Sequence, residues 1–149
     1  MSVMERILIS ACLVGDNVKY DGGNNKNPLI SKLLGKYELV PFCPEVEGGL
    51  PIPRHPCEQR GEQVVNDLDE DKTDEFNRGA DLALNICLYL KITKAILKER
   101  SPSCGVHEIY DGSFSHKVSP GMGVTAALLK RKGITIYSED EIPELLNLD

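Results

Sequence analysis

The sequence predicts a single α/β domain over residues 1–149, built on a mainly parallel, Rossmann-like sheet with helices on both faces and a small hairpin insertion. Short apolar runs alternate with longer segments whose apolar residues recur every three or four positions. Strands that alternate with helices in this way pair in parallel, and their connections place helices over the sheet. A chain of 149 residues buries enough apolar surface to fold without disulfides or a structural metal.

The first third of the chain supplies two strands and one short helix. Residues 6–10 and 37–42 are apolar runs typical of buried strands. A helix over residues 28–34 is expected between them, because Asn27 is a good N-cap and proline is favoured at the first helical position. The stretch 43–57 contains four prolines and two glycines, so we expect a long functional loop without regular structure.

The rest of the chain supplies the longest helix, two more strands of the sheet, a further short strand and a hairpin. The predicted elements are a short strand at 62–65, a helix at 73–89, a strand at 94–98, a hairpin at 106–120, a helix at 124–132, a strand at 134–137 and a helix at 139–146. The 73–89 helix has the clearest apolar stripe. The hairpin is expected to turn at Asp111 and Gly112, a favoured turn pair.

Composition argues against charged macromolecular partners. The net charge of −6 provides no basis for binding nucleic acid or an anionic membrane, and the low aromatic content of 5% argues against a surface that stacks the bases of a nucleic acid. No segment has the length of a membrane-spanning helix or the pattern of a signal peptide. We therefore expect a cytoplasmic protein with reduced thiols that acts on a small molecule, and its oligomeric state is open.

Three of the five cysteines lie just past predicted parallel strands: Cys12, Cys43 and Cys104. Because the carboxyl ends of parallel strands meet at one edge of a sheet, these cysteines are expected to converge where open α/β sheets bind ligands. The closely spaced cysteine pairs of zinc sites are absent, and ligation by thiolates alone suits iron–sulfur clusters. Such clusters normally take four cysteines, so three would leave one iron open as a Lewis acid.

Other interpretations of the cysteines stay open at this point. All three could be buried thiols without a chemical role, in a domain that binds a nucleotide or another small molecule. A thiol-redox enzyme is a further alternative, although it would need a close cysteine pair. Cys87 lies on the apolar stripe of the 73–89 helix and is expected in the core. Cys57, beside His55, could be a fourth ligand, but its spacing does not require this.

Seven motifs stand in order along nearly the whole chain and resemble the TudS-type 2-thiouracil desulfurase family. They are Ser10-Ala-Cys-Leu-Val-Gly15, Tyr20-Asp-Gly22, Pro41-Phe-Cys-Pro-Glu45, Gly48-Gly-Leu50, Pro53-Arg54, Glu99-Arg-Ser-Pro-Ser-Cys-Gly105 and Gly121-Met-Gly-Val-Thr-Ala126. The resemblance implies a [4Fe-4S] cluster held by Cys12, Cys43 and Cys104, whose open iron binds the substrate sulfur. The implied reaction is non-redox desulfuration of a thiolated base, from 2-thiouracil to uracil and hydrosulfide. Cys57 and Cys87 match no ligand of the family.

The resemblance also implies roles for residues near the cysteines. Glu45 and Ser101 are candidates for catalysis, substrate binding and proton handling. Ser103 and Asp21 are our further candidates for substrate binding, with Asp21 expected at the mouth of the pocket. From the residues alone, Glu45 could be a surface charge and Ser101 could cap the turn before Pro102. Outside these candidates, Arg54 is expected to hold the proline-rich loop or to pair with Glu45 or Glu58. His107 and His116 are expected on the surface or along a lid.

Overall fold

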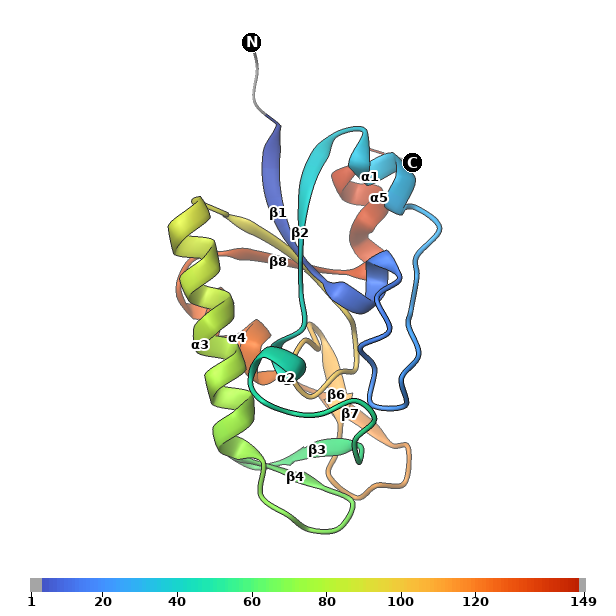
Figure 1. Ribbon diagram of the computed structural model, residues 1–149, viewed down its shortest axis with the longest axis vertical. Helices are drawn as coiled ribbons and strands as arrows, with labels where there is room; N and C mark the ends of the chain where they lie inside the picture. Colours follow the sequence, from blue (N-terminus) through green and yellow to red (C-terminus); the bar gives the residue numbers. More distant parts are fainter. Residues whose placement is uncertain (1–3, 148–149) are drawn as a thin grey trace.

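The computed structural model describes residues 4–147 and confirms the predicted fold class (Figure 1). Four parallel strands form the central sheet in the order β2-β1-β5-β8. Their bounds are β1 Glu5–Ser10, β2 Tyr37–Phe42, β5 Lys94–Leu97 and β8 Thr135–Ser138. The remaining elements are η1 (Ala11–Val14), α1 (Ile30–Leu34), α2 (Pro44–Glu47), β3 (Cys57–Arg60), β4 (Gln63–Asn66), α3 (Thr73–Leu90), β6 (Glu108–Tyr110), β7 (Val118–Pro120), α4 (Val124–Arg131), η2 (Glu139–Glu141) and α5 (Ile142–Leu145).

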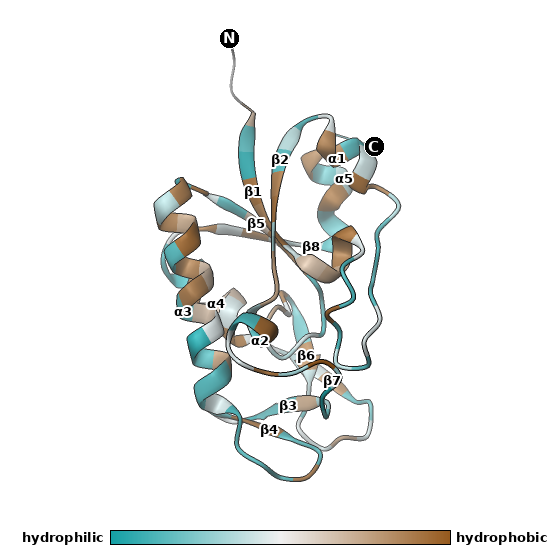
Figure 2. Cartoon of the chain, in the orientation of Figure 1, coloured by the Kyte–Doolittle hydropathy of each residue, from teal (hydrophilic) through white to brown (hydrophobic). Residues whose placement is uncertain are grey.

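Both faces of the sheet are covered, as predicted. Successive side chains of a strand point to opposite faces. In β1, Leu8 packs with residues of α3 and α4, whereas Ile7 and Ile9 pack with residues of α1 and α5. In Figure 2 the strands are mostly hydrophobic where they cross the middle of the molecule, whereas α3 is mostly hydrophilic over its first turns and more hydrophobic toward its C-terminal end. The sheet therefore has a hydrophobic core on each face, and the carboxyl ends of its parallel strands lie along one edge of the sheet.

The prediction for residues 43–57 was wrong in part, because this stretch contains regular structure. Pro44 begins the short helix α2, at a position where a helix needs no backbone N–H donor. Strand β3 begins at Cys57 and pairs antiparallel with β4, so the sequence predicted only one strand of this hairpin. Strands β6 and β7 form the predicted second hairpin, but residues 111–117 connect them rather than a two-residue turn.

Helix α2 is held in place by close contact with α3. A side chain at Gly79 of α3 would overlap the carbonyl group of Pro44, and one at Gly48 would overlap the carbonyl group of Glu75. Only glycine lets two backbones approach this closely. The packing of α3 therefore sets the position of α2, which begins directly after Cys43 and carries Glu45.

Replacing Gly79 by alanine is expected to destabilise the protein by about 2 kcal/mol, because overpacking outweighs the better helix propensity of alanine. Urea unfolding followed by circular dichroism measures the difference. Gly35→Ala is the matched control, since Gly35 has an ordinary φ of −75° and the nearest atom to a new Cβ lies 3.5 Å away. A Gly79→Ala protein as stable as the wild type would contradict the inferred contact.

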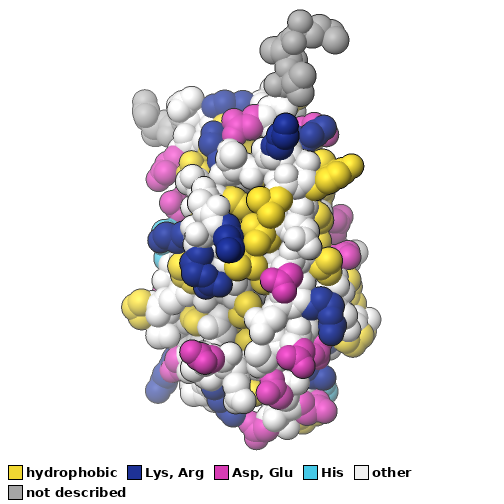
Figure 3. All heavy atoms as spheres, turned by 90° about the vertical axis from the view of Figure 1, so that its left-hand side faces the viewer, with side chains coloured by type: hydrophobic (Ala, Val, Ile, Leu, Met, Phe, Trp, Pro, Cys, Tyr) yellow, Lys and Arg dark blue, Asp and Glu magenta, His cyan; other side chains and the backbone are white. Residues whose placement is uncertain are grey.

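The C-terminal half of α3 carries exposed apolar side chains. Leu82, Leu88 and Tyr89 are exposed, and Leu82 and Tyr89 line a shallow hollow together with Val40 and Phe42 of the edge strand β2 (Figure 3). Helix α3 thus buries an apolar stripe in the core and leaves a few apolar side chains at the surface among exposed polar ones such as Asp81 and Asn85. No helix within residues 4–147 is long and apolar enough to cross a membrane.

Candidate active site

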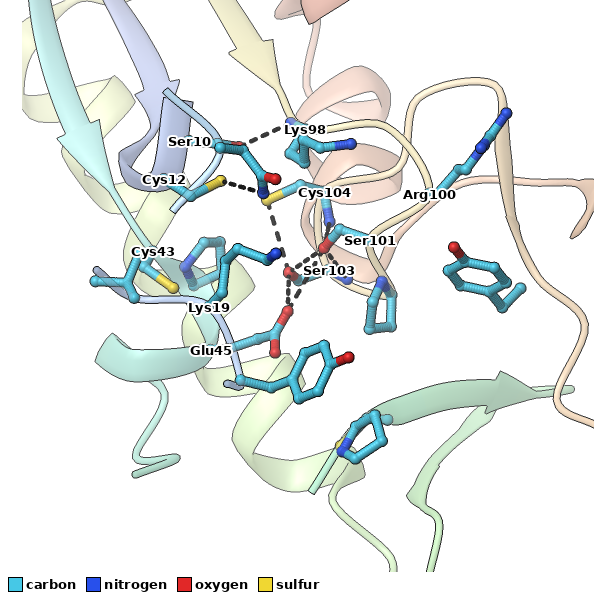
Figure 4. A pocket seen from close by; sticks show the side chains of 18 of the residues that line it. Ser10, Cys12, Lys19, Cys43, Glu45, Lys98, Arg100, Ser101, Ser103 and Cys104 are labelled. Carbon is cyan, nitrogen blue, oxygen red and sulfur yellow. Dashed lines mark hydrogen bonds between the residues drawn. The ribbon is translucent and has the colours of Figure 1, made fainter. Parts of the chain in front are cut away.

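A cavity of about 660 Å³ lies at the carboxyl ends of β1, β2 and β5. Cys12 follows β1 within η1, Cys43 follows β2 directly, and Cys104 lies in the loop after β5. All three line this cavity, and Figure 4 shows them around its inner wall. The topology therefore brings the three cysteines to one site, as the order of strands and cysteines in the sequence led us to expect.

Burial and neighbouring thiols suppress the ionisation of these cysteines. Burial raises the pKa of Cys104 to about 12, and the neighbouring Cys43 and Cys12 add to this rise. Burial likewise raises the pKa of Cys12, and Cys43 raises it further. A hydrogen bond from Asn25 Nδ2 at 3.5 Å lowers this pKa, but by less than burial raises it. The pKa of Cys43 is also raised, chiefly by burial. Buried thiols of this kind become good ligands when a bound metal removes their protons.

The donor set fits an iron–sulfur cluster. Its three donors are thiols, the ligand type that such clusters use. Within the described residues, no three His, Cys, Asp or Glu side chains are grouped around a position for a single metal ion. A cluster distributes its protein ligands over separate irons, so its thiols need not converge on one point. Cys12, Cys43 and Cys104 are the residues that would hold it.

Glu45 extends from α2 into the same cavity, where each carboxylate oxygen has partners. Its Oε2 accepts a hydrogen bond from Ser103 Oγ at 2.8 Å, and Ser101 Oγ lies 3.5 Å from the same oxygen (Figure 4). Its Oε1 accepts one from Arg54 Nε at 3.2 Å. The side chain is only 14% exposed, so Glu45 is not the surface charge that the residues alone allowed.

Two serines connect Glu45 to the cysteine loop. Ser101 Oγ accepts the backbone N–H groups of Ser103 at 3.2 Å and Cys104 at 3.1 Å, so it does cap a turn. These bonds occupy the Ser101 oxygen and direct its hydrogen toward Ser103 Oγ, which lies 3.0 Å away. Ser103 is buried, and its Oγ lies 3.6 Å from the sulfur of Cys104. The hydroxyls thus form a chain that ends on the carboxylate.

Two residues that were not candidates from the sequence, Glu99 and Gln59, hold the loop that carries Ser101, Ser103 and Cys104. Glu99 Oε1 accepts the backbone N–H groups of Val106 and His107, both at 2.8 Å. Burial raises the pKa of Glu99, but its backbone donors outweigh burial and lower the pKa overall. Gln59 Nε2 donates to the carbonyl oxygens of Pro102 and Met122, both at 3.0 Å. Glu99 stands in a motif, whereas nothing in the sequence around Gln59 marks it.

Arg54 pairs with Glu45 rather than with Glu58, and it also holds the loop. Its guanidinium donates to the carbonyl oxygens of Val18 at 2.9 Å and Pro51 at 3.2 Å. The arginine side chain is 6% exposed, so the ion pair with Glu45 at 3.2 Å is shielded from water. One buried cation therefore orients the carboxylate and joins it to two loops.

Replacing Arg54 by glutamine is expected to lower the free energy of unfolding by about 3–5 kcal/mol, because it leaves a buried carboxylate without its cation. Urea unfolding of the protein without cofactor measures the loss. Arg6→Gln is the control, since Arg6 and Glu38 are 41% and 53% exposed and such pairs contribute at most about 1 kcal/mol. Equal losses in both variants would contradict the importance of the buried pair.

The other candidate residues have mixed placements. Asp21 is exposed and is not among the residues lining the cavity; its carboxylate accepts the N–H of Gly23 at 2.9 Å. Cys57 does line the cavity, and burial raises its pKa to about 12. Cys87 lies in the core, as expected. His116 lines the cavity, whereas His107 pairs with Glu141 at 2.6 Å.

Comparison with known proteins agrees with this geometry. The sequence model of a family described as 2-thiouracil desulfurase matches residues 7–141. The solved structure of the [4Fe-4S]-dependent thiouracil desulfidase TudS is similar with a TM-score of 0.90 and 49% identity, covering 95% of each chain. A protein of Bacillus subtilis (strain 168), described as uncharacterized protein YbbK, is 40% identical over 150 residues, which are 94% of this chain and 99% of the relative.

Proposed function

The chain belongs to the 2-thiouracil desulfurase family, and we propose that it exchanges the thiocarbonyl sulfur of a base such as 2-thiouracil for oxygen from water. The products are uracil and hydrosulfide, and no electrons are gained or lost overall. The observation that carries this proposal is one cavity lined by three thiols and a buried carboxylate–serine chain. The similarity to a [4Fe-4S]-dependent thiouracil desulfidase supports it.

We assign Cys12, Cys43 and Cys104 as the protein ligands of a [4Fe-4S] cluster. When bound, a cluster with three protein ligands supplies one open, Lewis-acidic iron with affinity for a soft thiocarbonyl sulfur. The shared cavity and the thiol-only donor set support this assignment. The amide of Asn25 would stabilise Cys12 as a thiolate, since it already donates to that sulfur.

We assign Glu45 as the base that accepts the proton of the attacking water. Arg54 holds one carboxylate oxygen, which leaves Oε2 to the serines and to the cavity. Ser101 and Ser103 position the ring and exchange protons with Oε2 through their hydroxyl chain. The partly enclosed cavity keeps these groups away from most bulk water, which strengthens each polar contact.

The activity test uses protein loaded anaerobically with iron and sulfide and then mixed with 2-thiouracil. We expect uracil and hydrosulfide to appear in equal amounts, because each thiocarbonyl carbon loses one sulfur. Chromatography measures uracil and a colorimetric assay measures hydrosulfide. The same protein without its cluster serves as the control. Iron-loaded protein that converts no 2-thiouracil would contradict the proposal.

A further inference from the structure

The segment between β6 and β7 contributes aromatic side chains to the cavity, and none of them has a role so far. Phe114 and His116 lie in residues 111–117 and line the cavity together with Tyr110, the last residue of β6. The rings of Tyr110 and His116 meet edge to face, 6.5 Å apart. Phe114 is half-buried and has no polar group of its own. The cavity thus offers an apolar ring in addition to its thiols.

Phe114 adopts a backbone conformation that its side chain disfavours. Its φ is +57°, and that of His116 is +61°, so both lie in the left-handed region. Glycine and asparagine occupy this region readily, whereas a bulky residue does so only when its surroundings impose it. Backbone strain of this kind concentrates at functional sites. A loop that served only to connect two strands would be easier to build with glycine or asparagine at residue 114.

The neighbouring hairpin imposes this conformation. Glu58 of β3 is buried, and its Oε1 accepts the backbone N–H groups of Gly112 at 2.9 Å and Phe114 at 3.2 Å. Arg60 Nε donates to the carbonyl oxygen of Gly112 at 2.8 Å. The Arg60 guanidinium also lies over the Phe114 ring, 5.4 Å from its centroid. Strand β3 therefore holds both the backbone and the ring of Phe114.

We infer that Phe114 is a specificity-determining residue that stacks on the heterocyclic ring of the substrate, with Glu58 and Arg60 as the positioning residues that hold it. This inference rests on the proposed function, since it concerns the ring whose sulfur is removed. Planar bases gain affinity from an aromatic partner because each ring offers an apolar face. The rigid ring would favour planar thiocarbonyl compounds over aliphatic ones that also carry a soft sulfur.

Binding of uracil to cluster-loaded protein tests the inference without requiring turnover. Uracil has the ring but no sulfur, so its affinity, measured by calorimetry, reports on contacts to the ring. Phe114→Asn removes the aromatic ring while keeping a residue that tolerates a positive φ, and Phe114→Leu keeps apolar bulk. We expect both variants to bind uracil about tenfold more weakly, within the range for base–aromatic stacking. Phe114→Tyr should bind as the wild type does, and iron content should stay unchanged in all three.

Glu58→Gln tests the positioning role. We expect the KM for 2-thiouracil to rise severalfold with kcat changed by less than about threefold, and no further rise in the Phe114→Asn background. Glu62→Gln, in the exposed turn of the same hairpin, is the control. Wild-type affinity for uracil in Phe114→Leu and Phe114→Asn, or no uracil binding by the wild type, would overturn the inference. Wild-type protein that binds uracil through Phe114 yet releases no hydrosulfide would contradict only the proposed desulfuration.

Discussion

Replacing Cys104 by serine is expected to abolish hydrosulfide release and to reduce bound iron to less than about a tenth of the wild-type amount. Serine has a similar size but offers a hard oxygen in place of the soft thiolate that iron–sulfur clusters require. With the ligand set proposed above, the variant retains only two of the three cysteines that would hold the cluster. We expect the same result for Cys12→Ser and Cys43→Ser. Iron analysis and the absorption of the cluster near about 400 nm measure the loss.

Two other cysteines provide matched controls. Cys57→Ser changes a buried thiol of the same cavity, and Cys87→Ala changes a thiol in the core under α3. Both variants should retain iron, and Cys57→Ser should retain activity. Loss of iron in Cys57→Ser would make Cys57 a fourth ligand and remove the open iron from the mechanism. Full iron and sulfide content in Cys104→Ser would contradict the ligand assignment.

Replacing Glu45 by glutamine is expected to lower kcat by about 10²–10⁴-fold while the iron content stays unchanged. Glutamine keeps the shape of the side chain, and its carbonyl oxygen can still accept a hydrogen bond from Arg54, but it cannot take a proton from water. Single-turnover release of hydrosulfide measures the effect separately from product release.

Glu47 supplies the control for Glu45, because it belongs to the same short helix and is exposed. Glu47→Gln should have wild-type activity and iron content. Simultaneous loss of iron and turnover in Glu45→Gln would show that the carboxylate supports the cysteine loop through Ser103. Unchanged turnover would remove Glu45 from the proton-transfer role.

The local pattern of the sequence was sufficient for the sheet and for the convergence of the cysteines. Apolar runs such as Ile7-Leu-Ile9 predicted strands, and their positions between helical segments predicted parallel pairing. The sequence did not predict the short helix α2 or the strand β3, because the prolines of residues 43–57 argue against regular structure when only local sequence is considered. Both elements depend on tertiary contacts. Helix α2 packs closely against the backbone of α3 at Gly79, and β3 pairs with β4.

The candidate site likewise contains residues that were predicted from the sequence and residues that only the structure revealed. Cys12, Cys43, Glu45, Ser101, Ser103 and Cys104 were candidates from the sequence and the family resemblance, and the structure places all six at one cavity. Asp21 was a candidate too, yet its carboxylate turns to Gly23. The hydrogen bonds of Gln59 to the cysteine loop and the strained backbone of Phe114 could not be foreseen, since their partners lie on distant segments.

The sequence by itself determined that three cysteines would follow parallel strands, and therefore that they would meet at one edge of a sheet. This follows because strand direction and chain order depend on hydrophobic periodicity, which is local. Only the tertiary structure decided which carboxylate faces them, that Arg54 orients it, and that β3 holds Phe114 in the cavity wall. Those choices depend on hydrogen bonds and ion pairs between residues far apart in the chain, for which local spacing provides no signal.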